Sequence, residues 1–191
     1  MNQRAKAQDE TRESIVRATM ALHDAQGVAS TSFLDIAKRA GVGVATVYRH
    51  FPTLGSLVMA CGAHVWVEMD PPRPDQAADV FAGFATRKER LGRLAELLDA
   101  FYARGALRLQ GAWNDRERVV ELDQFLTAVE AGVAAWVDAA VGEVEPLSLT
   151  AMQGLTALAS FPVFTAMHRA GVEAPDRIRL LTQLFYSVAG L

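Results

Sequence analysis

The segment TSFLDIAKRAGVGVATVYRHF, residues 31–51, constrains the fold more than any other part of the chain. Ser32 with Asp35 three residues later has the form of a capping box, which predicts a helix that starts after Ser32 and ends at Gly41. A second helix is predicted from Val44 to His50. The intervening GVG is too short for the helices to lie antiparallel, so they must cross steeply as a helix-turn-helix.

The residue types inside and outside this pair fit the same geometry. Ala37 is small where the helices approach each other, and Gly41 permits the positive φ of a tight turn. The side chains expected to face inward are Ile36, Val42 and Val47. The outer face then carries Ala45, Thr46, Arg49 and the ring ends of Tyr48 and His50. Such a face fits the major groove of DNA. A merely solvated helix would not explain the turn and the capped neighbours.

Helical periodicity continues along the chain, and no alternating pattern predicts a strand. The other helices are predicted at 9–26, 54–69, near 76–85, 87–108 and 115–142, over the charge-free stretch 147–167, and from Pro175 to the end. The prolines of DPPRPD, residues 70–75, mark the clearest boundary. We therefore expect an all-α protein. Residues 1–53 are predicted to form a helix-turn-helix DNA-binding domain, which a linking helix at 54–70 joins to a helical effector-binding and dimerisation domain at 71–191.

Charge distribution favours the amino-terminal third as the part that meets a polyanion. The 191-residue chain has a net charge of −3, and residues 1–60 hold seven Lys/Arg and five Asp/Glu, a balance of +2. Residues 61–191 hold twelve and seventeen, a balance of −5. The single cysteine, Cys61, excludes an internal disulfide and a four-thiolate zinc site, and is expected to be a small buried residue.

The amino terminus is polar and lacks the apolar stretch of a secretion signal, which predicts a cytoplasmic protein. Residues 147–167 contain no charge and are about long enough to span a bilayer. However, polar side chains and Pro162 interrupt this stretch, and no basic flank anchors it. It is therefore predicted to be a buried helix rather than a membrane span.

Residues 10–65 strongly resemble the amino-terminal DNA-binding domain of TetR-type transcriptional repressors. The motif IAKRAGVGVATVYRHF, preceded by ESIVRATMALHDAQG, carries the resemblance. The rest of the chain resembles that family only in layout, as a helical ligand-binding and dimerisation domain. The resemblance implies a homodimer that binds double-stranded DNA at a palindromic operator, represses transcription, and is released by a small-molecule effector.

The resemblance also assigns roles to individual positions. Thr46, Tyr48 and His50 match DNA contacts, Ser32 and Thr53 match helix starts that meet phosphates, and Gly43, Val44 and Ala45 lie at the base-reading end. Arg49 adds positive charge. Two positions depart from the pattern. Leu54 stands where many relatives have a phosphate-binding lysine, which puts one backbone contact per subunit in doubt. Gly43 replaces the usual serine cap, and glycine caps a helix about as well as threonine but offers no side-chain oxygen.

The carboxy-terminal region is expected to supply a dimer interface and a pocket. Its last helix and the charge-free stretch carry more apolar surface than a small monomer covers, which predicts a four-helix bundle between two copies. Pro162 is expected to kink the charge-free helix and free a carbonyl near Leu158. Pocket candidates are aromatic and apolar residues: Trp66, Met69, Phe101, Tyr102, Trp113, Trp136, Met152, Phe161, Phe164 and His168. They favour a small, largely apolar ligand, although each also fits a core position.

Two other classes of function compete with a ligand-controlled DNA-binding regulator. An enzyme is not favoured, because the four histidines are scattered and no phosphate-cradling loop, nucleophile elbow or metal-ligand spacing occurs. No cofactor or metal is therefore expected. The second class is a DNA-binding regulator that answers to a protein partner or to no ligand. For a ligand-controlled protein, the predicted mechanism is that effector binding moves the helix at 54–69 and changes the separation of the recognition helices.

Overall fold

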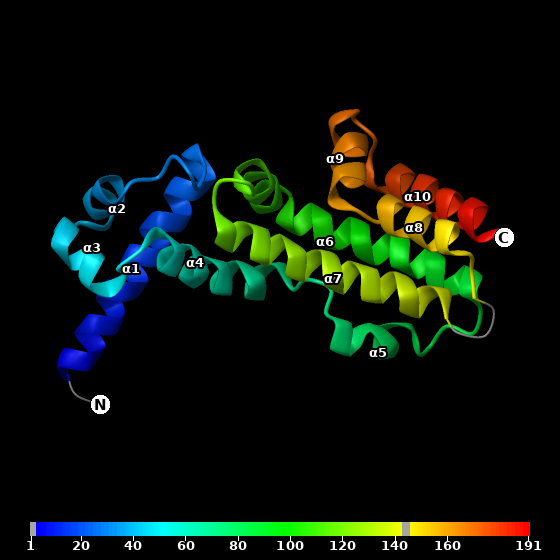
Figure 1. Cartoon of the computed structure of the whole chain (residues 1–191), viewed down its shortest axis with the longest axis horizontal. Coiled ribbons are helices and arrows are strands. Elements are labelled where there is room, and N and C mark those ends of the chain that lie inside the picture. The colour runs from blue at the N-terminus through cyan, green and yellow to red at the C-terminus, as the bar shows by residue number, and fades with distance from the viewer. Residues whose placement is uncertain (1–2, 143–145) are drawn as a thin grey trace. The chain divides into compact units, whose positions relative to one another are not determined.

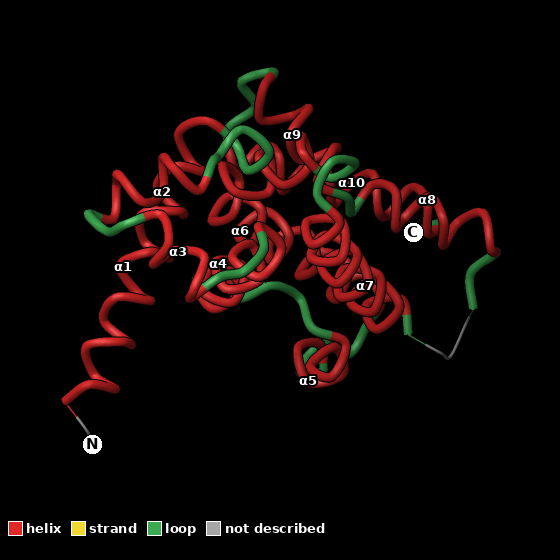
Figure 2. Tube along the Cα trace, turned by 60° about the vertical axis from the view of Figure 1, so that its left-hand side comes forward, coloured by secondary structure: helices red, strands yellow, loops and turns green. Residues whose placement is uncertain are grey.

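The computed structural model describes residues 3–142 and 146–191, and within them every regular element is a helix (Figures 1 and 2). The predicted all-α fold is thus confirmed. The chain forms two compact units, one of Met1–Glu68 with Leu107–Leu126, the other of Met69–Ala106 with Thr127–Leu191. The second unit starts close to the predicted boundary at 70–71. Residues 107–126, however, join the first unit although they lie within the predicted second domain.

The first unit is built on four helices: α1 (Gln3–Gln26), α2 (Phe33–Ala40), α3 (Val44–His50) and α4 (Leu54–Met69). One apolar core joins them, formed by Ile15, Val16, Ile36, Ala37, Val47, Phe51, Leu57 and Cys61. The predicted burial of Cys61 is confirmed, since it is 4% exposed and burial raises the pKa of its thiol to about 12. The thiol therefore stays protonated and unreactive in the folded protein.

Local signals fixed most of these helix ends. Gly27 and Gly41 both have positive φ, 86° and 69°, where α1 and α2 stop. The start of α1 differs, because the helix begins at Gln3 rather than at residue 9. The early residues are good helix formers on an exposed surface, and Lys6 pairs with Glu10 at 3.9 Å one turn later. Sequence periodicity misses such a segment because it buries nothing.

Three predicted helices of the second unit have different bounds. The segment at 76–85 is a 3-10 turn, η1 (Pro74–Gln76), followed by the short α5 (Ala77–Phe81). The helix at 87–108 continues as α6 (Arg87–Asp115), because nothing before Asp115 stops it. The next helix, α7 (Val120–Val141), starts five residues later than predicted. Both α6 and α7 contribute residues to each unit.

The charge-free stretch is two helices, not one kinked helix. It breaks between α8 (Leu149–Leu158) and α9 (Phe161–Arg169), which are bent by 48°. Pro162 lies in the first turn of α9, where no backbone N–H is needed, so it frees no carbonyl. At this break, the buried carbonyl of Ala159 accepts a hydrogen bond from the Tyr102 hydroxyl at 2.8 Å. Among the described residues, α7 alone is long and apolar enough by itself to cross a membrane, a test that core helices also pass.

Polar ties hold the second unit together around α6. Arg87 and Arg90, at the start of α6, donate to the carbonyls of Val141 and Ala140 at 2.9 and 3.0 Å, which places α6 antiparallel to α7. The last helix, α10 (Ala174–Ala189), packs against α8. Arg177 of α10 makes a two-pronged ion pair with Asp99 of α6, at 2.7 and 3.1 Å. This pair is buried in the core of the unit.

Candidate nucleic-acid interface

The crossing of α2 and α3 is held from inside by very few side chains. Ile36 and Val47 are completely buried and Ala37 is 2% exposed, whereas Val42 is only half-buried. Gly41 closes the turn, with the N–H of Val42 donating to the carbonyl of Ala37 at 3.0 Å. Val47 is the only fully buried residue of α3, and Ala45, Tyr48 and Arg49 are exposed, so one face of this helix is open to solvent.

The outer face of α3 carries the residues predicted for it. Gly43 caps the helix without a side-chain hydrogen bond, Ala45 and Arg49 are exposed, and Tyr48 is 50% exposed. Val44, Thr46 and His50 are half-buried. Arg49 Nη2 donates a hydrogen bond to Thr46 Oγ1 at 3.2 Å, which restrains the arginine side chain. Small side chains therefore stand at the helix start, and hydrogen-bonding groups lie in the turns that follow.

The starts of α2 and α4 carry the other two predicted contacts. Ser32 Oγ accepts the N–H of Asp35 at 3.2 Å, as the capping box predicts, and donates to Asp35 Oδ2 at 2.5 Å. Thr53 Oγ1 accepts the N–H of Ser56 at 3.0 Å, while Ser56 Oγ accepts the N–H of Thr53 at 3.3 Å. Ser56 was not identified from the sequence, although its position three residues after Thr53 is the signal of a reciprocal cap.

Two aromatic contacts near this face were also missed. The rings of Phe33 and Tyr48 are parallel within 1°, with centroids 4.5 Å apart. The guanidinium of Arg12, on α1, lies 5.0 Å from the ring centroid of Phe51, which ends α3. Both pairs join residues on different helices. Helical spacing within one element therefore gives no signal for them.

Residues 107–126 are fastened to the remainder of the first unit. Asp115 Oδ2 accepts the N–H of Ala29 at 2.9 Å, across 86 positions of sequence. Arg108 forms ion pairs with Asp24 of α1, at 3.7 Å, and with Glu68 of α4. Phe125 of α7 meets Trp66 of α4 edge-on, with centroids 5.6 Å apart. The carboxy-terminal end of α6 and the amino-terminal end of α7 thus contact α1 and α4, whose apolar residues share one core with Val47 of α3.

His23 lies partly buried in α1, and its Nε2 has no hydrogen-bond partner among the described residues. Burial lowers its pKa below 6.5, opposed by the charges of Asp24 and Asp115. As the pH falls below 6.5, the unfolded chain therefore takes up a proton before the folded one does. We expect the thermal unfolding midpoint to decrease as the pH is lowered from about 7.5 to about 5.5, and to decrease less in His23→Gln. Circular dichroism measures the midpoint of each protein. An equal decrease of the unfolding midpoint in the wild type and in His23→Gln would show that His23 does not cause the pH dependence.

The ten predicted pocket residues do not gather in one place. Trp66 and Trp113 belong to the first unit, and Trp113 is 37% exposed beneath the guanidinium of Arg116. Met69 lies in the second unit and is 2% exposed. A second group is tightly packed: Phe101, Tyr102, Phe161, Phe164 and His168. The cavity beside them measures about 10 Å³, barely room for one water.

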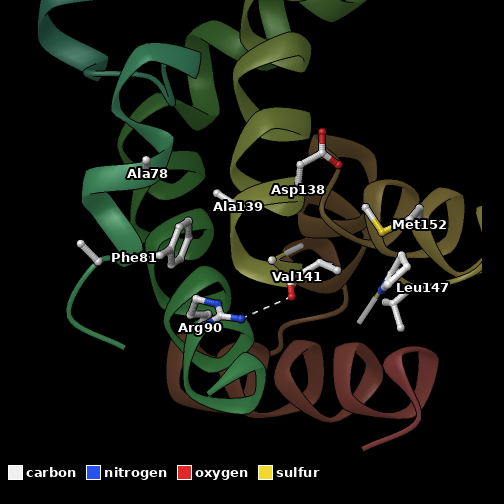
Figure 3. Close-up of a pocket in the computed structure, with 11 residues that line it drawn as sticks. Ala78, Phe81, Arg90, Asp138, Ala139, Val141, Leu147 and Met152 are labelled. Carbon is white, nitrogen blue, oxygen red and sulfur yellow. Dashed lines mark hydrogen bonds between the residues drawn. The ribbon is translucent and has the colours of Figure 1, made fainter. Parts of the chain in front are cut away.

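A larger hollow of about 660 Å³ opens in the second unit. Ala78 and Phe81 stand on one side, Leu147 and Met152 on the other, and Ala139 and Val141 between them (Figure 3). Met152 alone of the predicted pocket residues lines it. Trp136 packs edge-on against Phe81 at 6.3 Å, and its Nε1 has no partner among the described residues.

The polar groups of this hollow are few. The guanidinium of Arg90 donates hydrogen bonds to backbone carbonyls, including that of Val141 (Figure 3). Its charge is therefore compensated within the protein. Among the described residues of the lining, Asp138 contributes the one carboxylate. Among residues 3–142 and 146–191, no three His, Cys, Asp or Glu side chains are placed to hold a metal ion. The hollow is thus suited to a mainly apolar molecule.

Comparison with known proteins gives a consistent result. Residues 15–61 match the family model described as bacterial regulatory proteins, tetR family. Among solved structures, TetR-family transcriptional regulators from Streptomyces coelicolor and Pseudomonas syringae pv. tomato str. DC3000 each superpose with a TM-score of 0.60. The Streptomyces protein is 19% identical to the chain, and the match covers 95% of this chain and 80% of that protein. The Pseudomonas protein is 23% identical, and the match covers 95% of this chain and 96% of that protein.

A TetR-like transcriptional regulator from Rhodococcus sp. RHA1 is 15% identical with a TM-score of 0.61, and the match covers 95% of this chain and 97% of the regulator. No curated protein sequence matches the chain. At these identities, the three structures establish a common fold. The family match falls on the helices that form the candidate interface.

Proposed function

We propose that this chain is a TetR-family transcriptional repressor that binds a palindromic operator as a homodimer and is released by a small molecule, as the family match over residues 15–61 and the shared fold support. One observation carries the proposal: α3 buries only Val47 and turns its small and hydrogen-bonding side chains outward. We also place the protein in the cytoplasm, where such a repressor meets DNA.

Three helix starts support the mode of DNA binding. Ser32, Gly43 and Thr53 directly precede α2, α3 and α4, and all three are exposed. Helix amino termini attract phosphates because their free N–H groups and dipoles point outward. In this proposal, α3 reads bases through Gly43, Ala45 and Thr46. Tyr48, Arg49 and His50 contact the backbone of the DNA.

Exposed leucines support a dimer through α8 and α10. Leu149 is 74% exposed, and Leu180 and Leu184 are 41% and 43% exposed. Because α8 and α10 already pack against each other, two copies of this helix pair would form a four-helix bundle. A twofold dimer then presents two copies of α3 to the two half-sites of a palindrome.

The hollow beside α7 supports an effector. Its volume of about 660 Å³ falls within the usual range of small-molecule sites, and its lining is mostly apolar. The effector would act through α6 and α7, since residues 107–126 of these helices contact α1 and α4. A shift of α7 would thereby move α4 and change the separation of the recognition helices.

DNA capture tests this proposal. Sheared genomic DNA from the source organism is incubated with the protein at near-physiological salt, and retained fragments are sequenced, with Tyr48→Ala as the control. Enrichment of one or a few palindromes by the wild type alone would support it. No enrichment by protein that has been unfolded, freed of small molecules and refolded would contradict it.

The carboxylate of Asp35 gives a further prediction. It lies against Ser32 at the start of α2, where it would repel an approaching phosphate. Asp35→Asn retains an acceptor for the Ser32 hydroxyl but removes the charge. We expect the variant to bind duplex DNA several-fold more tightly at low salt, with the gain shrinking as salt rises, and to be less stable by about 0.3–1 kcal/mol. Titration at two salt concentrations measures this, and weaker binding at both would contradict it.

A further inference from the structure

The stack of Phe33 on Tyr48 joins the start of α2 to the outer face of α3. Phe33 is the first residue of α2, directly after the capping Ser32, and Tyr48 lies on the outer face of α3. Their rings are parallel within 1° and 4.5 Å apart. Phe33 is half-buried at the edge of the core, and Tyr48 is 50% exposed. One face of the tyrosine ring is therefore covered, while the other side of the residue remains open.

This contact restricts a side chain that would otherwise be mobile. An exposed tyrosine on a short helix can occupy more than one rotamer, and binding DNA in only one of them would cost conformational entropy. Val47 anchors α3 and Ile36 anchors α2, each with no exposed area, so the backbone positions of both rings are fixed. The stack then selects the ring orientation, and no interaction of the Tyr48 hydroxyl is found among the described residues to oppose it.

We propose that Phe33 is a positioning residue for DNA binding, which holds the Tyr48 ring so that its hydroxyl can donate to a DNA phosphate. The inference rests on the proposed function, because it requires that Tyr48 meet DNA. Phe33 does not touch the DNA in this scheme. Its contribution is to fix the donor before binding and so to reduce the cost of ordering it.

The test is a double-variant cycle with a probe that needs no known operator. Wild type, Phe33→Leu, Tyr48→Phe and the double variant are titrated against a mixed-sequence duplex of about 30 base pairs at about 50 mM salt, where phosphate contacts dominate. Phe33→Leu keeps an apolar group at the core edge but removes the ring. We expect it to weaken binding about tenfold in the wild type, and by less than about twofold when Tyr48 already lacks its hydroxyl.

Two readouts separate positioning from simple packing. Phe33→Tyr restores a stacking ring and should bind within about twofold of the wild type. In the absence of DNA, the ring-current shifts of the Tyr48 resonances, identified with Tyr48→Ala, should disappear in Phe33→Leu and persist in Phe33→Tyr. Thermal unfolding of each variant verifies that the fold is retained.

The outcomes distinguish this inference from the proposed function. If the wild type binds no duplex, the proposed function fails and the inference fails with it. If the wild type binds but Phe33→Leu binds equally well, only the inference is overturned. An equal loss with and without the Tyr48 hydroxyl would also overturn it, because Phe33 would then act through the fold and not through that hydroxyl.

Discussion

Replacing Tyr48 with alanine is expected to weaken binding to every duplex by a similar factor, at least about 100-fold. The phenol is half exposed on the outer face of α3, where a hydrogen bond to a charged phosphate oxygen contributes about 1.5–3 kcal/mol. A homodimer loses this contact in both half-sites. Because phosphates are the same in all sequences, the loss should not depend on the sequence of the probe. Titration against the captured operator and an unrelated duplex measures both losses.

Thr46→Ala is the matched control, since it changes a neighbouring side chain of the same helix. Thr46 lies nearer the start of α3, where the proposed base contacts are made. We expect it to alter which bases are preferred and to leave binding to unrelated duplexes within about threefold of the wild type. Equal losses at every sequence for both variants would contradict the division into base-reading and phosphate-binding residues.

The interface was largely predictable because its geometry is encoded locally. Gly41 supplies the positive φ of the turn, and Ser32 caps α2 through an N–H only three residues away. The burial of Ile36 and Val47 follows from helical spacing within the same short segment. A pattern of about twenty residues therefore contains nearly all the information that places α3 on the surface.

The parts that could not be predicted depend on contacts between distant segments. Asp115 reaches Ala29 across 86 positions, and no local signal shows that the end of α6 belongs with the first unit. The same holds for the pocket. Aromatic composition selected Phe101 and Tyr102, but packing of α9 against them leaves only about 10 Å³ of space. Of the predicted pocket residues, only Met152 lines the larger hollow. Much of its remaining wall consists of alanines and aliphatic residues, such as Ala78, Ala139 and Val141, which carry no distinctive sequence signal.

Replacing Asp99 with alanine is expected to destabilise the protein by about 3–5 kcal/mol. Its carboxylate accepts two hydrogen bonds from Arg177, at 2.7 and 3.1 Å, and both side chains are 8% exposed. Without Asp99, the contacts that remain to the guanidinium among the described residues are the carbonyl of Val172 and the face of the Phe164 ring. A buried charge with so little compensation is costly. Urea unfolding followed by circular dichroism measures the change in the free energy of unfolding.

The paired variant Asp99→Leu with Arg177→Met shows whether charge or shape causes this loss. Both replacements are apolar and similar in length to the groups they replace, so no charge remains buried. We expect the paired variant to be more stable than Asp99→Ala and within about 2 kcal/mol of the wild type. If both variants were equally unstable, the loss would come from packing between α6 and α10.

Because α10 also carries the exposed leucines of the proposed dimer, Asp99→Ala should further reduce the dimer fraction at low protein concentration, and the paired variant should restore it.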